Sequence, residues 1–264
     1  MIYNRVNFFS KVLCQHVDVD ILLPSMSDNE TYLANNLDSV YQKKEYPVLY
    51  LLHGALDDHT MWLRYSRIEE YAQKANIAVV MPSGQNGFYT DAKMGLNYFT
   101  FITEELPRML KTYFPISNKR EDTYITGPSM GGYGASKIAL RCIDRFKAFA
   151  DLSGALDHPK LEKAMCAMGF DFFRYDLVFG GSDKTPGTLD DVYYLANYHK
   201  DSPLKPEAYV YCGLDDSANL EMNKRFYDEL VNNNFIAHFT DGEGGHDFAY
   251  WDNCIKDFLE KISH

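Results

Sequence analysis

The sequence predicts an α/β fold, in which helices cover both faces of a mainly parallel central sheet. Val48–Leu52 is a near-continuous apolar run that ends at His53-Gly54, a pattern typical of a strand buried on both faces. From this run onward, apolar segments alternate with helical stretches, the order that βαβ units produce. The 264 residues, 46% hydrophobic and 24% charged, suffice for a large core without a disulfide or metal staple.

Loosely alternating apolar residues over 5–22 indicate edge strands or a hairpin, and the polar residues 24–46 indicate a connecting loop. Buried strands are predicted at 48–52 and 77–81, and further strands at 123–126, 148–152, 209–212 and 236–239. Helices are predicted at about 97–113, 130–145, 219–233 and 248–261, with Pro107 as a kink or an internal helix start.

Residues 155–206 break this rhythm, because aromatic clusters there lie between turns that contain Gly and Pro. One interpretation is a cap-like insertion over the carboxyl edge of the sheet. The other is an irregular helical connection without a role in substrate binding. In both cases we expect residues 1–264 to form a single domain.

The formal net charge of −11 disfavours nucleic acids and anionic membranes as partners. No apolar run approaches the roughly 20 residues that span a bilayer, and the N-terminus lacks the pattern of a signal peptide. The five cysteines are scattered, odd in number and without a C-x-x-C pair, so neither a zinc site nor a disulfide framework is indicated. We therefore expect a cytoplasmic protein with no metal or cofactor; a homo-oligomer stays open.

Gly127-Pro128-Ser129-Met130-Gly131 is a G-x-S-x-G motif between a predicted strand and a predicted helix. That context is the one a nucleophile elbow requires, because the serine occupies a tight, strained turn with no room for side chains at 127 and 131. The helix that follows would place N–H groups and a positive dipole end beside the serine hydroxyl. Ser129 is therefore the candidate nucleophile.

A serine nucleophile needs a base, and the base needs an orienting acid. The predicted strand at 209–212 leads to Asp215 and Asp216, and His246 follows the last predicted strand on a glycine-containing loop. We assign His246 as the base and Asp216 as the acid, with Asp215 as the alternative. His238 lies within the last predicted strand and is interpreted as a packed, hydrogen-bonded residue.

Acyl transfer also needs N–H donors aimed at the developing oxyanion. One donor is expected to be the backbone N–H of Met130. The other is expected on the loop after the first buried strand, from Ala55 or alternatively Leu56. His53 is interpreted as a residue that shapes this loop.

On these residues the chain resembles the putative-esterase family of α/β-hydrolases, which includes esterase D, tributyrin esterases and feruloyl esterases. The resemblance covers most of the chain and rests on motifs listed here in order: Leu51-Leu52-His53-Gly54 with Asp57-Asp58 and Trp62, Phe88-Tyr89-Thr90-Asp91, Glu105-Leu106-Pro107, Gly127 to Gly132, Cys212 to Asp216, and His246-Asp247-Phe248 with Trp251. It implies the α/β-hydrolase fold, a triad of Ser129, Asp216 and His246, and an oxyanion hole from Ala55 and Met130.

The function predicted is that of a serine carboxylic-ester hydrolase for short-chain acyl esters, with acetyl or feruloyl esters of sugars as candidate substrates. Its partner would be a small-molecule or carbohydrate-linked ester. S-formylglutathione hydrolysis or acyl transfer on the same triad is the second hypothesis. A non-catalytic binding module is the third, and loss of a triad residue would be its signature.

Overall fold

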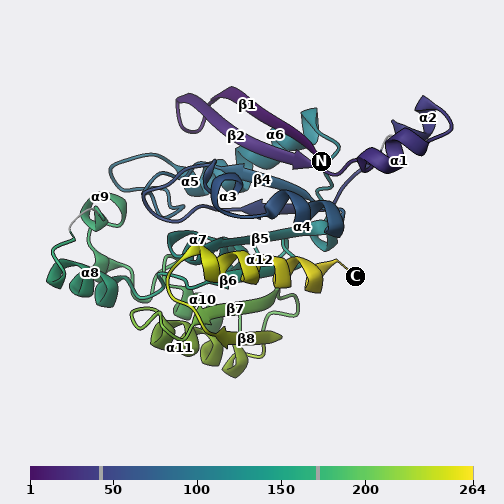
Figure 1. Cartoon of the computed structure of the whole chain (residues 1–264). Coiled ribbons are helices and arrows are strands. Elements are labelled where there is room, and N and C mark those ends of the chain that lie inside the picture. Colours follow the sequence, from purple (N-terminus) through teal and green to yellow (C-terminus); the bar gives the residue numbers. More distant parts are fainter. Residues whose placement is uncertain (42–43, 171–172, 264) are drawn as a thin grey trace.

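The computed structural model describes residues 1–41, 44–170 and 173–263, and these form one eight-stranded sheet in the order β1-β2-β4-β3-β5-β6-β7-β8 (Figure 1). Its strands are β1 (Ile2–Ser10), β2 (Gln15–Leu23), β3 (Val48–Leu51), β4 (Ala78–Pro82), β5 (Thr123–Pro128), β6 (Ala148–Leu152), β7 (Glu207–Gly213) and β8 (Ala237–Gly242). The strands from β3 to β8 pair in parallel, whereas β1 and β2 form an antiparallel hairpin joined to β4. The predicted α/β fold with a mainly parallel sheet is confirmed.

The helices are α1 (Asp28–Leu33), α2 (Leu37–Val40), α3 (Met61–Tyr65), α4 (Ile68–Ala75), α5 (Tyr98–Thr100), α6 (Leu106–Tyr113), α7 (Met130–Arg141), α8 (His158–Ala167), α9 (Tyr175–Val178), α10 (Val192–Tyr198), α11 (Leu220–Asn232) and α12 (Phe248–Ile262). The helix predicted to reach residue 145 thus ends at Arg141, four residues earlier.

Two separate cores explain why the central strands are apolar along their whole length. Leu49 and Leu51 of β3 belong to the core that α3, α4 and α12 cover. Tyr50 of β3 and the following Leu52 point to the opposite face, where α6, α7, α10 and α11 pack. Successive side chains of a strand face opposite sides of the sheet, so both sets must be apolar.

The helix predicted over 97–113 is interrupted. A π-helical turn (Phe101–Glu105) separates α5 from α6, and the N–H of Leu106 bonds to the carbonyl of Phe101. Pro107 lies in the first turn of α6, where its missing N–H leaves no hydrogen bond unmade. The proline is therefore a helix start, one of the two roles its position allows.

The segment 155–206 divides into two parts, and residues 171–172 lie outside the described residues. Helices α8 and α9 lie beyond one end of the strands, on the left in Figure 1. Helix α10 instead packs against α7 and α11 in the helical layer.

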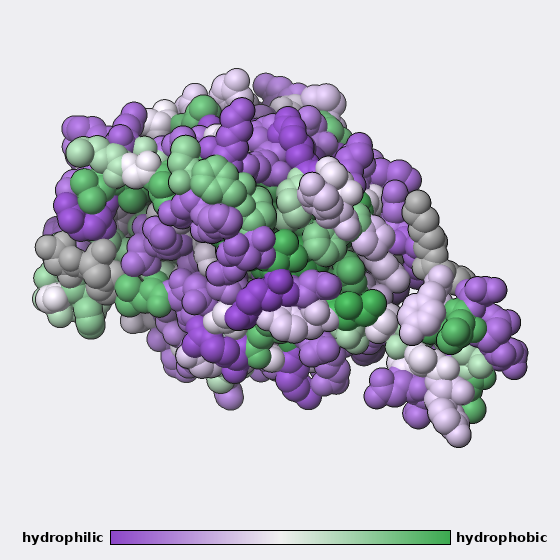
Figure 2. Space-filling model, turned by 90° about the horizontal axis from the view of Figure 1, so that it is seen from above, coloured by the Kyte–Doolittle hydropathy of each residue, from purple (hydrophilic) through white to green (hydrophobic). Residues whose placement is uncertain are grey.

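The connection predicted over 24–46, of which 42–43 lie outside the described residues, contains the short helices α1 and α2. Neither helix buries a residue, and the segment projects from the body (Figure 2). A local motif supports α1 instead: Ser27 and Glu30 form a capping box, which satisfies N–H groups at the start of the helix. The large apolar side chains exposed here are Tyr32, Leu33, Leu37 and Tyr41.

Candidate active site

The three predicted triad residues all follow carboxyl ends of parallel strands. Ser129 comes directly after β5, Asp216 comes shortly after β7, and His246 lies on the loop between β8 and α12. Because parallel strands end at a common edge, the fold brings all three to the same edge of the sheet.

Ser129 has the strained backbone of a nucleophile elbow, with φ 55° and ψ −116°. A Cβ atom added at position 127 would lie 2.9 Å from Leu52 Cβ, and one added at position 131 would lie 2.8 Å from the carbonyl oxygen of His53. Both positions therefore require glycine. The turn is held by hydrogen bonds: the N–H of Ser129 donates to Leu152 (2.9 Å), and its carbonyl accepts from Tyr133 (3.0 Å). Ser129 itself is partly exposed, so its hydroxyl is accessible.

The structure pairs His246 with Asp216 through a 2.7 Å contact between Nδ1 and Oδ2. Asp216 is 4% exposed. Asp215 is exposed, and the hydrogen bond it forms runs from its backbone N–H to Gly244. A carboxylate at Nδ1 fixes the tautomer with the proton on that nitrogen and leaves Nε2 free to accept a proton. The geometry therefore favours Asp216 over Asp215 as the orienting acid.

Asn219 is a residue that the sequence reasoning missed. Its amide Nδ2 donates to Asp216 Oδ1 (2.9 Å) and Oδ2 (3.2 Å), and lies 3.0 Å from His246 Nδ1. Burial alone would raise the pKa of Asp216, but the hydrogen bond and positive charge of His246, together with the Asn219 bonds, outweigh it and lower the pKa. Asp216 therefore stays ionised next to the imidazole. Nothing in the sequence pattern distinguishes Asn219 from an ordinary helix-preceding asparagine.

Trp251 connects His246 to the nucleophile side of the site. Its ring lies edge-on to the imidazole, with centroids 4.9 Å apart. The indole Nε1 donates to Ser153 Oγ (3.2 Å). Ala155, two residues after Ser153, donates its N–H to the carbonyl of Ser129 (3.1 Å). Trp251 belongs to the family motif, but the motif alone indicates no role for it.

A third carboxyl group, Asp151 at the end of β6, is fully buried beneath the elbow. An added Cβ at Gly132 or Gly154 would lie 2.3 or 2.2 Å from its Oδ1, so both glycines make room for it. Burial raises the pKa of Asp151 well above its usual range, which keeps the group neutral. A neutral, enclosed carboxyl group does not fit the role of the acid that orients His246.

The two candidates for the second oxyanion donor differ in their hydrogen bonding. The N–H of Leu56 donates to Asn86 Oδ1 (2.8 Å), and Leu56 has a left-handed φ of 66°. Among the described residues, no hydrogen bond uses the N–H of Ala55. Met130 opens α7, where backbone N–H groups have no partner within the helix. The structure therefore leaves Ala55 and Met130 as free donors.

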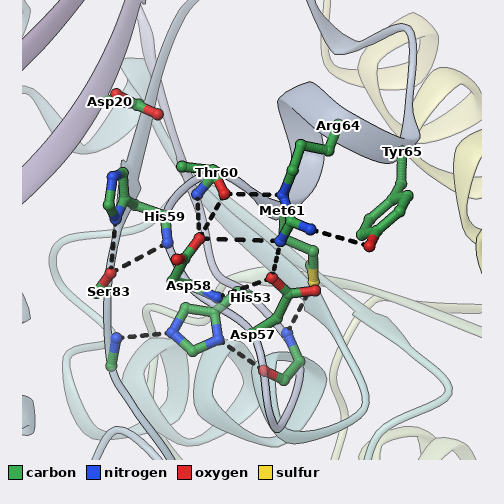
Figure 3. A network of polar contacts seen from close by, with 12 residues as sticks. Asp20, His53, Asp57, Asp58, His59, Thr60, Met61, Arg64, Tyr65 and Ser83 are labelled. Carbon is green, nitrogen blue, oxygen red and sulfur yellow. Dashed lines mark hydrogen bonds and ion pairs between the residues drawn. The ribbon is translucent and has the colours of Figure 1, made fainter.

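His53 holds this loop from inside. Its Nδ1 bonds to the carbonyl of Gly54 (2.6 Å), and its Nε2 accepts from the N–H of Gly84 (2.8 Å) (Figure 3). Because Nε2 accepts, the ring proton lies on Nδ1. Burial lowers the pKa of His53, and the ring stays neutral. These contacts agree with its interpretation as a loop-shaping residue.

The acidic pair Asp57-Asp58 stabilises the next turn of the same loop (Figure 3). Asp58 Oδ1 accepts from Thr60 N (2.8 Å) and Thr60 Oγ1 (2.6 Å), whereas Asp57 Oδ1 bonds to Arg64 Nη2. Further in, Met61 Sδ lies 3.4 Å from the N–H of Gly54. The contacts of these carboxylates are local and structural.

Tyr89 bonds to the backbone of the loop that carries the candidate oxyanion donor Ala55. Its hydroxyl accepts from the N–H of His53 (2.9 Å) and donates to the carbonyl of the same residue (2.9 Å). The ring is fully buried between Gly84 and Gly134, where an added Cβ would lie 2.3 Å from its ring carbons. The tyrosine therefore fixes the backbone just before the candidate donor Ala55. Tyr89 lies within a family motif, but the motif alone does not indicate this role.

The described residues contain neither a cluster of metal ligands nor a membrane-spanning helix. No group of three or more His, Cys, Asp or Glu side chains is arranged to hold a metal ion. In the same part of the chain, no helix combines the length and apolarity needed to cross a membrane. The five cysteines all carry free thiols.

Comparison with known proteins gives matches along the whole chain. A model of the family described as "Putative esterase" matches residues 10–262. An acetyl esterase from Caldicellulosiruptor saccharolyticus is 32% identical over 266 residues, which cover 98% of this chain and 97% of that protein.

Two solved structures from Staphylococcus aureus are similar as well. The fluorophosphonate-binding serine hydrolase F, solved with substrate bound, aligns with a TM-score of 0.86 at 30% identity, over 100% of this chain and 98% of its own. An S-formylglutathione hydrolase aligns with a TM-score of 0.84 at 31% identity, over 100% and 99% of the two chains.

Proposed function

The chain belongs to the family described as "Putative esterase" and is a carboxylesterase of the α/β-hydrolase fold, and we propose that Ser129 is its nucleophile, His246 its general base and Asp216 its orienting acid. The observation that carries this assignment is the 2.7 Å His246–Asp216 contact at the same sheet edge as the strained Ser129 elbow. A serine nucleophile, a histidine base and an acid bonded to the histidine are the groups that acyl-enzyme chemistry needs.

In the proposed mechanism, Ser129 Oγ attacks the ester carbonyl while His246 Nε2 takes its proton. Asp216 holds the imidazole through Nδ1 and stabilises the imidazolium that forms. The N–H groups of Ala55 and Met130 stabilise the oxyanion. The imidazolium then gives its proton to the leaving alcohol, and water hydrolyses the acyl-enzyme by the same steps in reverse order. No cofactor takes part.

The packing next to the elbow supports a short acyl group. Tyr133, one turn of α7 after Ser129, packs on His158 with ring centroids 4.4 Å apart and on Phe88 at 6.0 Å. Tyr175 and Phe179 complete this buried aromatic cluster. We infer that this filled cluster limits the acyl group to a short chain, and the acetyl esterase relative supports the same inference. We propose acetyl esters, including those of sugars, as substrates.

S-formylglutathione hydrolysis is the second candidate, because a hydrolase of that substrate is 31% identical over the whole chain. Acyl transfer and feruloyl-ester hydrolysis use the same triad and stay predictions. The cap-like role of the α8–α9 segment, the cytoplasmic location and a homo-oligomeric state also stay predictions.

Labelling with a fluorophosphonate tests the nucleophile. Wild-type protein should be labelled at residue 129, and Ser129→Ala should lose both the label and nearly all turnover, with a loss on the order of 10⁶ in kcat. Ser217→Ala is a matched control, because Ser217 is an exposed serine close to Asp216 in the chain. Labelling of the Ser129→Ala protein at the elbow helix, or full activity without Ser129, would contradict the assignment.

A substrate panel tests the specificity. The panel compares acetyl, butyryl, octanoyl and feruloyl esters, acetylated xylose and S-formylglutathione by kcat/KM. We expect acetyl esters to lead and octanoyl esters to fall far behind. A preference for S-formylglutathione by more than about tenfold, or 1.4 kcal/mol, would favour the second candidate and leave the triad assignment intact.

A further inference from the structure

A cavity lies at the edge of the sheet opposite the candidate active site. Its volume is about 340 Å³, within the range of small-molecule sites. It is lined by Thr123, the first residue of β5, whereas Ser129 follows the last residue of that strand. Six strand residues separate the two points, roughly 20 Å at 3.3 Å per residue. The cavity is therefore distinct from the esterase site.

The floor of this cavity is apolar. Ile102, Leu110, Ile116 and Phe146 line it, and each is at most 5% exposed. Such a surface suits the hydrocarbon part of a ligand, because every apolar area removed from water stabilises the bound state.

The rim of the cavity is cationic, in contrast to a chain whose net charge is −11. Arg108 and Lys111 lie three residues apart on α6 and therefore on one helix face. Glu104 is the one acidic residue among the described lining residues, and it already binds Arg108 Nη1 (2.7 Å) and Arg145 Nη2 (2.7 Å). One carboxylate thus faces three cations, so the rim carries a positive excess.

Donors remain available at this rim. Within the described parts of the chain, Lys111 Nζ makes no hydrogen bond or ion pair, and Arg108 uses its Nη1 alone. Tyr50 lines the wall and is 6% exposed, and its hydroxyl has no hydrogen-bond partner among the same residues. The hydroxyl is not among the enclosed polar atoms of the described residues, so a ligand in the cavity can reach it and form a hydrogen bond in place of water.

The π-helical turn supplies three lining residues: Ile102 in the floor, Glu104 at the rim, and Thr103 between them in the sequence. Turns of this kind are rare and occur frequently at functional sites. Here the wider turn separates α5 from α6 and sets the direction in which α6 presents its cations.

We propose that this cavity binds a small amphipathic monocarboxylate, with its apolar body on Leu110, Ile116 and Phe146 and its carboxylate between Arg108 and Lys111. The arginine offers unused N–H donors for a charge-assisted hydrogen bond, and the lysine supplies a second unpaired charge. An inorganic anion would leave the floor uncovered, and a neutral alcohol would leave the cations unpaired. The proposal does not depend on the assignment of the triad.

Calorimetric titration with hexanoate, hexanol and inorganic phosphate tests this site. We expect hexanoate to bind wild type and Ser129→Ala equally, and hexanol and phosphate to bind at least about tenfold more weakly. The double variant Arg108→Gln/Lys111→Met should weaken hexanoate by more than about tenfold, since each lost charged hydrogen bond removes that order of affinity. Tyr50→Phe should weaken it by a few fold.

The control is Lys256→Met, which removes an exposed lysine of α12 on the other helical layer. It should leave hexanoate binding unchanged. Because Arg108 and Lys111 are exposed, the double variant should keep the unfolding midpoint of wild type. Absence of hexanoate binding, equal binding of hexanol, or unchanged binding in the double variant would overturn the proposal. Loss of binding in Ser129→Ala alone would place the ligand in the esterase site instead.

Discussion

Tyr89→Phe removes one oxygen atom and two hydrogen bonds from the oxyanion loop. The hydroxyl is the partner of both the N–H and the carbonyl of His53, and the residue is fully buried. A buried backbone group left without a partner costs about 1–3 kcal/mol, so the two together should lower the free energy of unfolding by roughly 2–6 kcal/mol. The ring lies between Gly84 and Gly134 and cannot shift to compensate.

The same substitution should reduce catalysis, because His53 directly precedes the loop that carries the Ala55 donor. Loss of one oxyanion donor costs about 10²–10³ in kcat, and a loosened donor should cost part of that. We therefore expect kcat for an acetyl ester to fall by about 10- to 100-fold, with KM little changed. Urea unfolding and steady-state kinetics measure the two effects.

Tyr98→Phe is the matched control. Tyr98 is also buried, at 4% exposed, but none of the described residues hydrogen-bonds to its hydroxyl. It should change the free energy of unfolding by less than about 0.5 kcal/mol, the usual range for a substitution that removes no interaction. If Tyr89→Phe matched Tyr98→Phe in both stability and kcat, the conclusion that the Tyr89 hydroxyl holds the His53 backbone in place would be wrong.

Three further predictions concern the orienting acid, the buried Lys137 and the effect of a chelator. Asp216→Asn should cost about 10⁴ in kcat and Asp215→Asn far less; the reverse order of the two rates would move the role to Asp215. Burial lowers the pKa of Lys137 from 10.5 to about 8, so its folded form loses a proton that the unfolded chain keeps. Stability of wild type relative to Lys137→Met should therefore rise between pH 8 and 10.5; a flat difference in urea unfolding would refute this. Finally, EDTA should leave esterase turnover unchanged, because side chains and backbone supply every proposed step; activity restored by added zinc would contradict it.

The fold was predictable because its signals are local. Buried strands such as β3 and β4 are apolar runs, and turns rich in Gly or Pro mark strand ends, as at His53-Gly54 and Gly127–Gly131. The parts that differed depend on tertiary packing. The π-helical turn before Pro107 has no sequence periodicity of its own. Helix α10 was assigned to the insertion because its aromatic residues do not show in the sequence which side of the helix packs on α7 and α11.

The candidate site was predictable only where a motif carries the chemistry. The G-x-S-x-G sequence marks Ser129, and the order of strands suggests His246 and an acid, for which the sequence favours Asp216 over the neighbouring Asp215 by position alone. Burial and the Nδ1 contact make that distinction, and both exist only in the folded chain. Asn219 was missed for the same reason: the role of its amide depends on its hydrogen-bond partners in the folded chain.

The strain at Ser129 explains why the surrounding residues are needed. A non-glycine residue at positive φ costs about 1–3 kcal/mol and persists only where neighbouring structure holds it. Here the holding contacts come from three directions: Leu152 of β6 accepts from the serine N–H, Tyr133 donates to its carbonyl from α7, and Ala155 donates to it from the following loop. These are backbone hydrogen bonds, so a substitution that shifts β6 or the 153–155 loop should displace Ser129, the proposed nucleophile, although it changes no residue of the proposed triad. The esterase site is therefore as much a property of the carboxyl edge of the sheet as of its three side chains.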